Sequence, residues 1–248
     1  MNATKTTLAV LWLLMTPVLL AGKADEVLDK SAKVLGGEIA AKEITSLILN
    51  GQATMPQGLT ADLQVLMKDG GKLYTKMEIV GQGMSMVAEQ GCDGTECYEK
   101  NPMMGTRKLE GQEKENLLLQ NDFKAILNWR DHYKEVAYLK EENVGDRATH
   151  KIKIVTNAGM EMVQYIDKET YLILKTEALM TSAMGQMNVI STFHQYKDIH
   201  KGFQIPMETN VSVMGQQMNL VIKETEINAK IPDSKFQLPS ELTAAATE

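Results

Sequence analysis

The feature that most constrains this chain is its division into short extended runs separated by a few turn residues. The turn signals include Asn50-Gly51, Pro56-Gln57-Gly58, Asp69-Gly70-Gly71, Asn157-Ala158-Gly159 and Met214-Gly215-Gln216. Runs this close together can pair only as antiparallel neighbours, because a parallel crossover needs a dozen or more residues. The spacing therefore predicts a mainly β protein built as antiparallel meanders.

About twelve strands follow from this spacing, in two groups. The runs lie at 44–55, 59–68, 72–80, 81–90 and 95–100, and then at 133–139, 150–156, 161–167, 170–181, 187–197, 203–214 and 217–227. An antiparallel sheet of this size curls rather than staying flat. We therefore expect one large curved sheet, whose concave side encloses either a packed core or a ligand cavity.

Two segments have the apolar spacing of helices. The first, Asp25 to Leu35, begins at a residue that can cap a helix and ends before Gly36-Gly37. The second, Gly111 to Trp129, separates the two groups of strands and has a predicted break near Asn121-Asp122. We expect the second helix to lie across one face or mouth of the sheet.

The N-terminus has the pattern of a secretory signal peptide. Lys5 precedes an apolar run from Leu8 to Ala21, and Gly22 and Ala24 are small residues at the two positions that signal peptidase reads. The run is shorter than the roughly 20 apolar residues that a membrane helix needs. We expect cleavage after Ala24, with Ala21 as second choice, and therefore a periplasmic or otherwise exported protein that does not span a membrane.

The expected domain organisation follows directly. Residues 1–24 are the predicted signal peptide, residues 25–239 are one domain, and residues 240–248 are expected to be disordered.

Removing Lys5 and Lys23 from the 26 basic residues leaves 24, against 32 acidic residues, and no basic cluster is present. Nucleic acid is therefore not an expected partner.

The two cysteines, Cys92 and Cys97, flank a hairpin signal at Asp93-Gly94. An exported chain meets an oxidising environment, so the expected state is a structural disulfide between them. A redox pair, a metal site and free thiols are the alternatives. The C-x4-C spacing and the lack of a nearby histidine make the metal site the weaker interpretation.

No catalytic set is recognisable in the sequence. His132, His150, His194 and His200 lack metal-ligand spacing, and no serine lies in a G-x-S-x-G context. Gly81-Gln82-Gly83 lacks the third glycine and the following helix of a phosphate-binding loop. We therefore expect no enzyme activity, no cofactor and no metal.

Methionine is unusually frequent, with 17 residues against four phenylalanines. Met84 and Met86, like Met160 and Met162, place two thioethers on one face of a strand. The methionines replace Leu and Phe in an ordinary core, line a cavity that adapts to apolar guests, or bind Cu(I). For the cavity, the expected lining residues are Met84, Met86, Met160, Met162, Met187, Leu118 and Phe123.

Several segments, in order, carry a resemblance to a known superfamily. They are AKVLGG at 32–37 before ITSLILNG at 44–51, GTECY at 94–98 before NPMMGTRKL at 101–109 and a helix, YIDKETYLI at 165–173, and YKD at 196–198 with GFQIP at 202–206. With these segments the chain resembles the outer-membrane lipoprotein-sorting proteins, the LolA/LolB-like superfamily. The resemblance covers roughly Asp25 to Pro239.

The resemblance implies an incomplete β-barrel with helices over its opening. It also implies a periplasmic carrier that holds a lipid or a lipoprotein acyl chain in an apolar cavity, without chemistry or metal. The sorting protein proper has a cavity arginine in an early strand, whereas residues 44–90 contain no arginine here. The chain is also longer and adds the loop between Cys92 and Cys97. Another apolar cargo, an envelope protein-interaction module with a filled barrel, and a Met-based copper-binding protein therefore stay open.

Overall fold

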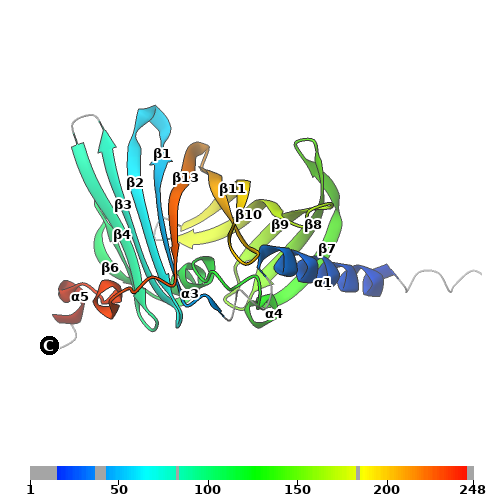
Figure 1. Ribbon diagram of the computed structural model, residues 1–248, viewed down its shortest axis with the longest axis horizontal. Coiled ribbons are helices and arrows are strands. Elements are labelled where there is room, and N and C mark those ends of the chain that lie inside the picture. Colours follow the sequence, from blue (N-terminus) through cyan, green and yellow to red (C-terminus); the bar gives the residue numbers. More distant parts are fainter. Residues whose placement is uncertain (1–15, 37–42, 82–83, 183–184, 245–248) are drawn as a thin grey trace, which may run out of the picture.

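The computed structural model describes residues 16–36, 43–81, 84–182 and 185–244. They form one antiparallel sheet of 13 strands, in the order β6-β5-β4-β3-β2-β1-β13-β12-β11-β10-β9-β8-β7. Figure 1 shows that the sheet is bent, with β1–β6 and β13 upright on one side and β7–β9 inclined on the other. The predicted mainly β fold with one large curved antiparallel sheet is confirmed.

Two meanders make up this sheet. The first comprises β1 (Ser46–Thr54), β2 (Thr60–Lys68), β3 (Lys72–Gly81), β4 (Met84–Asp93), β5 (Cys97–Asn101) and β6 (Gly105–Leu109). The second comprises β7 (Tyr133–Val144), β8 (Arg147–Thr156), β9 (Glu161–Asp167), β10 (Ile173–Ser182), β11 (Gly185–His200), β12 (Phe203–Val213) and β13 (Gln216–Ile227). A seam between β1 and β13 joins them, so β6 and β7 are the two edges of the described sheet.

The chain passes from one edge to the other through residues 110–132, which we call the crossing segment. It contains α3 (Gly111–Gln120) and α4 (Trp129–His132), with turns between them. The backbone N–H and the side-chain amide of Asn121 both donate to the Leu117 carbonyl, at 3.3 and 3.0 Å, and end α3. The predicted break near Asn121-Asp122 is therefore confirmed. In Figure 1, α3 lies below the centre of the sheet, between its two sides.

The first helix, α1 (Thr16–Leu35), begins earlier than predicted, so Asp25 lies inside it rather than at its cap. Ala24, Val27 and Leu28 share one helical face, are at most 3% exposed, and pack in the same cluster as Ile152 of β8. This burial explains why α1 lies along β7 in Figure 1. Residues 16–24 of the predicted signal peptide belong to this helix, and residues 1–15 lie outside the described residues, so its cleavage stays a prediction.

Gly36 follows α1 at a close approach between elements. Its φ is +153°, and a Cβ atom at this position would lie 2.5 Å from Cδ2 of Phe203. The predicted stop at Gly36 therefore has a packing reason as well as a conformational one. Gly37 lies outside the described residues.

The strands that differ most from the prediction are β6 and β7; β8, β10 and β11 differ by up to three residues at an end. β6, at 105–109, was not predicted, because a five-residue strand with two adjacent charges lacks a clear apolar alternation. β7 continues to Val144, so Glu141 and Glu142 lie in a strand and not in the expected loop. Charged side chains suit an edge strand, and Glu142 pairs across to Lys151 of β8 at 3.2 Å.

The C-terminal segment packs on the sheet. Phe236, in the short helix η2 (Asp233–Phe236), is 1% exposed and lies in a cluster with Leu66 and Ile231. The expected docking of this aromatic residue is confirmed. The tail was expected to be disordered, but Ser240–Ala244 form α5, whose first turn is closed by a hydrogen bond from Leu242 to the Pro239 carbonyl. Residues 245–248 lie outside the described residues.

Cys92 and Cys97 form the predicted disulfide. They lie opposite each other in the β4–β5 register and are both fully buried. Their neighbours in the apolar cluster include Leu73 and Leu109, which lie on the strands that flank β4 and β5. The crosslink therefore fixes the register of the first meander near its edge.

Candidate ligand-binding cavity

A cavity of about 560 Å³ lies between the concave face of the sheet and the crossing segment. Most of its walls are aliphatic and aromatic side chains, and they come from both meanders. The strands supply Leu47, Leu49, Leu63, Val65, Met67, Tyr133, Met162, Gln164, Ile173, Thr176, Phe193, Tyr196, Phe203, Gln204, Ile205, Pro206, Thr209, Leu220 and Ile222, and the β8–β9 turn supplies Met160. A mainly apolar space with a few polar groups, in the range of roughly 300–1,000 Å³, is typical of small-molecule sites.

Regular alternation accounts for much of this lining. Leu63, Val65 and Met67 of β2 point to one face because successive side chains of a strand alternate. Leu47 and Leu49 of β1 follow the same rule. On these two strands of the first meander, every second residue in the sequence therefore faces the concave side.

Irregularities of two strands bring further residues to the same face. Phe193 and Tyr196 of β11 both line the cavity although they are three positions apart. Between them Gln195 has a φ of +53°, and the pairing with β12 is interrupted there without a change of register. Ile173 and Thr176 of β10 both line the cavity because the register with β9 shifts between Ile173 and Lys175, as at a β-bulge.

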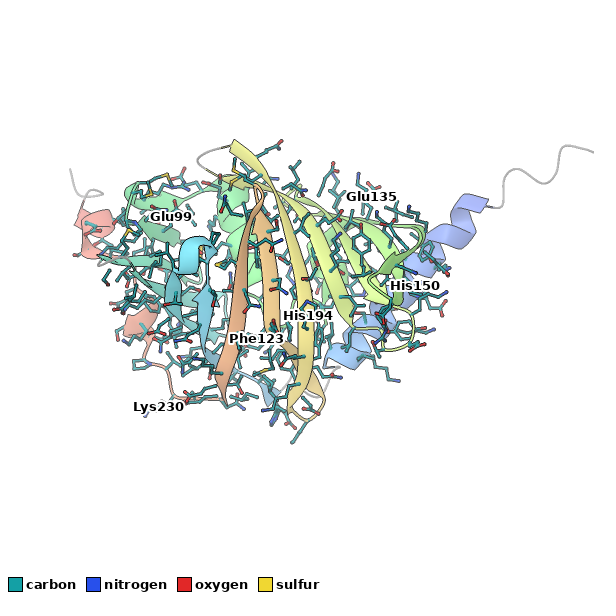
Figure 2. The ribbon with its side chains drawn as sticks, turned by 90° about the horizontal axis from the view of Figure 1, so that it is seen from above. Glu99, Phe123, Glu135, His150, His194 and Lys230 are labelled. Atoms are coloured by element: carbon teal, nitrogen blue, oxygen red, sulfur yellow. A yellow bond between two sulfur atoms is a disulfide. The ribbon has the colours of Figure 1, made fainter. Side chains whose placement is uncertain are left out.

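The crossing segment covers the cavity with residues 119–126, apart from Lys124. Phe123 meets Phe203 of β12 edge to face, with ring centroids 6.4 Å apart. Beside it, Lys124 forms a 2.6 Å ion pair with Asp69 in the β2–β3 turn. Figure 2 places Phe123 near the middle of the molecule, as expected for a side chain between the two sides of the sheet.

Among the polar side chains of the wall, Gln164, Tyr133 and Tyr196 come from three different strands. Gln164 of β9 is 6% exposed, and its side chain is hydrogen-bonded to Tyr133, while its Oε1 atom has no partner among the described residues. Burial raises the pKa of Tyr133 to about 12, although the bond to Gln164 lowers it in part. Burial also raises the pKa of Tyr196, whose hydroxyl donates to the Ile173 carbonyl at 2.8 Å. Both phenols are therefore neutral at physiological pH.

The lining is almost uncharged. Its described residues include one acid, Asp122, and neither lysine nor arginine. The Asp122 carboxylate accepts a hydrogen bond from the Lys124 backbone at 2.8 Å and lies 3.7 Å from the His132 ring. The wall formed by the sheet thus offers an anionic ligand no opposite charge.

A second hollow, of about 450 Å³, adjoins the cavity beneath the crossing segment. Its charged lining residues are Lys68 and Lys72 on one side, and Glu115, Asp122 and Asp131 on the other. It shares Leu119, Asn121, Asp122 and Phe123 with the cavity. These shared residues form the boundary between a polar outer hollow and an apolar inner one.

The residues predicted for the lining fall in different places. Met160, Met162 and Phe123 line the cavity, whereas Leu118 lines the polar hollow. Met187 lines two other hollows, one beside the β12–β13 turn and one beside α3. Met86 of β4 is half-buried and does not belong to the cavity lining, and the side chain of Met84 lies outside what the structure describes. Ligand binding by any of these residues stays a prediction.

Most of the wall was not singled out from the sequence. Aliphatic pairs at two-residue spacing could have revealed it, as in Leu47 and Leu49, or Leu220 and Ile222. The frequency of methionine drew attention instead to residues that lie elsewhere. Met103 and Met214, for example, are 90% and 78% exposed at hairpin turns.

The histidines, which could act in catalysis or bind a metal ion, lie in different parts of the described structure. His150 is buried in β8, and His200 pairs with Glu43 at 3.1 Å near the β11–β12 turn. In the part of the chain that the structure describes, no group of three or more His, Cys, Asp or Glu residues is placed to hold a metal ion. What the described cavity offers is burial of apolar surface together with a few hydrogen-bonding groups.

Comparison with solved structures identifies the architecture. A LolA superfamily protein from Nitrosomonas europaea matches with a TM-score of 0.56 and 13% identity, over 87% of this chain and 97% of that one. A domain described as an outer membrane lipoprotein-sorting protein domain, from Vibrio parahaemolyticus, matches with a TM-score of 0.55 and 12% identity, again over 87% and 97%. The fold is LolA-like. The resemblance inferred from the sequence segments is thus confirmed at the level of the fold.

A third structure shares the LolA-like fold, a DUF1329 family protein from Desulfovibrio piger. It matches with a TM-score of 0.58 and 12% identity, over 86% of this chain and 97% of that one. No protein-family model and no curated protein sequence matches this chain. At 12–13% identity the likeness concerns the fold alone.

Among the described helices of this LolA-like chain, none combines the length and the apolar character that crossing a bilayer requires.

Proposed function

We propose that this chain is a non-enzymatic carrier that binds an acyl chain of a lipid or lipoprotein in its cavity. The observation that carries the proposal is the cavity of about 560 Å³, which has apolar walls where a filled core would have side chains. Each methylene group buried there contributes ~0.8 kcal/mol to binding. The LolA-like fold, and the description of the Vibrio domain as lipoprotein-sorting, support the same class of ligand.

The crossing segment is the proposed cover through which the ligand enters. Its polar contacts with the sheet include the Lys124–Asp69 ion pair near its middle and a 2.7 Å hydrogen bond from Thr181 to Gln112 of α3. Leu117, Ala125 and Trp129 of the segment are buried. Entry of the ligand would therefore require the segment to give up polar and apolar contacts and move away from Phe203, while the sheet keeps its hydrogen bonds.

The proposed site of action is outside the cytoplasm. The predicted signal peptide at residues 1–24 and the disulfide between Cys92 and Cys97 support export. In the periplasm a protein that shields an acyl chain from water would serve transport between membranes. An envelope protein partner would then receive or deliver the cargo.

The test is binding of an apolar ligand with a cavity-filling variant as comparison. Val65 lines the cavity, so Val65→Trp fills it with a large ring. Leu179 is 42% exposed on β10, so Leu179→Trp adds the same ring outside the cavity. We expect the wild type and Leu179→Trp to bind an apolar fluorescent dye and to co-purify with lipid detected by mass spectrometry. Val65→Trp should bind the dye at least tenfold more weakly.

Circular dichroism and thermal unfolding check that both variants keep the fold. If the folded wild type binds neither dye nor lipid, the carrier proposal is wrong, and a protein-interaction module becomes the better interpretation. If Val65→Trp binds the dye as well as the wild type, the ligand lies elsewhere.

A further inference from the structure

The connections between strands differ in charge at the two ends of the sheet. Since neighbouring strands are antiparallel, alternate connections lie at the same strand ends, and β11 in Figure 2 spans the molecule from one such end to the other. At one end, each of the five connections contains a charged residue, and examples are Asp69, Glu96, Asp146, Lys168 and Lys201. None of the six connections at the other end contains one, and they are residues 55–59, 82–83, 102–104, 157–160, 183–184 and 214–215.

The uncharged end also carries most of the exposed apolar side chains. Among the described residues, six large apolar side chains are exposed, and five of them lie in the uncharged connections or within three residues of one. These five are Val80, Met103, Met104, Leu179 and Met214. Single exposed apolar side chains are common on protein surfaces, whereas a group of them marks a surface that binds another molecule.

Two neighbouring hollows join the methionines of three hairpins into one surface. Met104, Met180 and Met187 line a hollow of about 330 Å³, and Met187 and Met214 line the next one, of about 410 Å³. Met180 and Met187 lie directly opposite each other in the β10–β11 pairing. Met103 adjoins Met104 and is 90% exposed. We call Met103, Met104, Met180, Met187 and Met214 the methionine rim.

The hairpins of the methionine rim end freely. A Cβ atom added to Gly105, Gly185 or Gly215 would lie more than 4 Å from every neighbouring described atom. A protein partner would have to match such separate points with a closely packed surface of its own. A fluid lipid surface can instead close around each point, and unbranched thioether side chains adapt to disordered acyl chains.

The charges beside the methionine rim are already paired. Arg107 lines the 330 Å³ hollow and binds two other lining residues, Glu99 at 2.8 Å and Glu113 at 2.7 Å. The three connections of the rim contain no lysine or arginine that could attract anionic headgroups. Contact with a lipid surface would therefore depend on apolar side chains entering it, and hardly on charge.

We propose that the methionine rim inserts shallowly into the surface of a lipid bilayer and docks the protein there. The charged connections at the other strand ends then stay in water. This inference goes beyond the proposed carrier function, because docking needs no ligand in the cavity. A carrier docked in this way would meet the membrane with which it exchanges its cargo.

Site-specific fluorescence tests which part of the protein enters the bilayer. Cys92 and Cys97 are joined in the disulfide, so a single added cysteine can carry an environment-sensitive label such as NBD. Met103→Cys and Met214→Cys place the label on the rim, and Lys201→Cys places it on an exposed, charged connection. Each exported protein is mixed with phosphatidylcholine vesicles. We expect a blue shift and about a twofold rise of emission for the two rim labels alone.

Vesicle flotation tests how much the rim contributes to binding. The double variant Met103→Asp/Met214→Asp should bind phosphatidylcholine vesicles at least about tenfold more weakly, because two apolar side chains are replaced by charges. Leu139→Asp is the matched control, since Leu139 is 46% exposed in β7, away from the rim, and should bind as the wild type does. Phosphatidylglycerol in the vesicles should not strengthen binding. Met103→Asp alone replaces the double variant if the latter does not fold.

The outcomes separate docking from the carrier function. The double variant should still bind the apolar dye in the cavity, so loss of vesicle binding with dye binding kept supports docking by the rim. If the rim labels do not shift with either vesicle, the lipid proposal is wrong and a protein becomes the expected partner of the rim. If the Lys201→Cys label shifts as much as the rim labels, or Leu139→Asp weakens binding as much as the double variant, the rim is not the docking surface.

Discussion

His150 is a buried titratable side chain between α1 and the second meander. It is 7% exposed, its Nδ1 lies 3.2 Å from the Tyr138 hydroxyl, and its ring stacks on Tyr171 with centroids 6.1 Å apart. Figure 2 shows His150 at the side of the molecule that carries α1. Desolvation lowers the pKa of His150, and the charge of Lys23 lowers it further. The folded protein therefore keeps this imidazole neutral.

The depressed pKa of His150 predicts a pH dependence of stability. In the unfolded chain a histidine titrates near 6.5, so below that pH the unfolded state binds a proton that the folded state resists. The free energy of unfolding should therefore fall as the pH drops from about 7 to about 5. The other charged groups that act on His150 are Glu141, Lys168 and Lys30.

His150→Gln tests this prediction, because glutamine keeps a polar group near Tyr138 and does not titrate. Urea unfolding at several pH values should give a smaller slope of unfolding free energy against pH for the variant than for the wild type. Equal slopes between pH 7 and 5 would show that His150 does not contribute. His194→Gln is the control, since His194 is exposed on β11 and should leave the slope unchanged.

At the scale of the elements, the disulfide between β4 and β5 should stabilise the first meander. A crosslink that closes so short a loop reduces the entropy of the unfolded chain by an amount worth about 2 kcal/mol. We expect reduction of the wild type to lower the free energy of unfolding by about this much. Urea unfolding with and without reductant measures it, and an unchanged midpoint would contradict the prediction.

The ion pair between Arg107 of β6 and Glu113 of α3 should help to hold the crossing segment against the edge of the sheet. Arg107 of β6 binds Glu99 of β5 at 2.8 Å and Glu113 of α3 at 2.7 and 2.9 Å. The pair is about one-third exposed on the arginine side, so we expect it to contribute up to about 1 kcal/mol. Arg107→Ala should raise amide hydrogen exchange in α3 by about two- to fivefold.

Lys108→Ala is the matched control for Arg107→Ala. Lys108 is the next residue of β6 and pairs with Glu96 at 2.9 Å rather than with α3. Exchange in α3 should be the same in this variant as in the wild type. Equal exchange in all three proteins would mean that Arg107 does not hold the crossing segment in place.

At the scale of the whole molecule, the seam between β1 and β13 holds the two meanders in one sheet. Gly51 lies at a register shift in this seam, and a Cβ atom there would meet the Val221 carbonyl and lie 3.1 Å from Cα of Ile222. Backbone atoms cannot move aside as a side chain can. The seam therefore requires glycine at this position.

Gly51→Ala should lower the free energy of unfolding by about 1–3 kcal/mol, because overpacking against backbone displaces one strand from the other. Thr54→Ala, at an exposed position of the same strand, should stay within ~0.5 kcal/mol of the wild type. Chemical denaturation measures both. If Gly51→Ala left the free energy of unfolding unchanged, β1 and β13 could move apart at this position without a loss of stability.

The sequence predicted most strands of the fold because turn residues and short runs are local signals. Strands at 60–68 and 72–81 were found from Asp69-Gly70-Gly71, whereas β6 was missed because its five residues include two charges. The cavity wall was harder to predict. The positive φ of Gln195 in β11 and the register shift after Ile173 in β10 change which side chains face inward, and composition reveals neither irregularity.

The sequence alone determined the antiparallel class, the disulfide and the break in the crossing segment, since each depends on residues close together in the chain. Tertiary structure decided that β1 pairs with β13, that the crossing segment covers the concave face, and that side chains of both meanders line one apolar cavity. These features depend on the relative placement of strands that lie far apart in the sequence. Pairing over such distances is set by the packing of the whole sheet, which no short segment encodes.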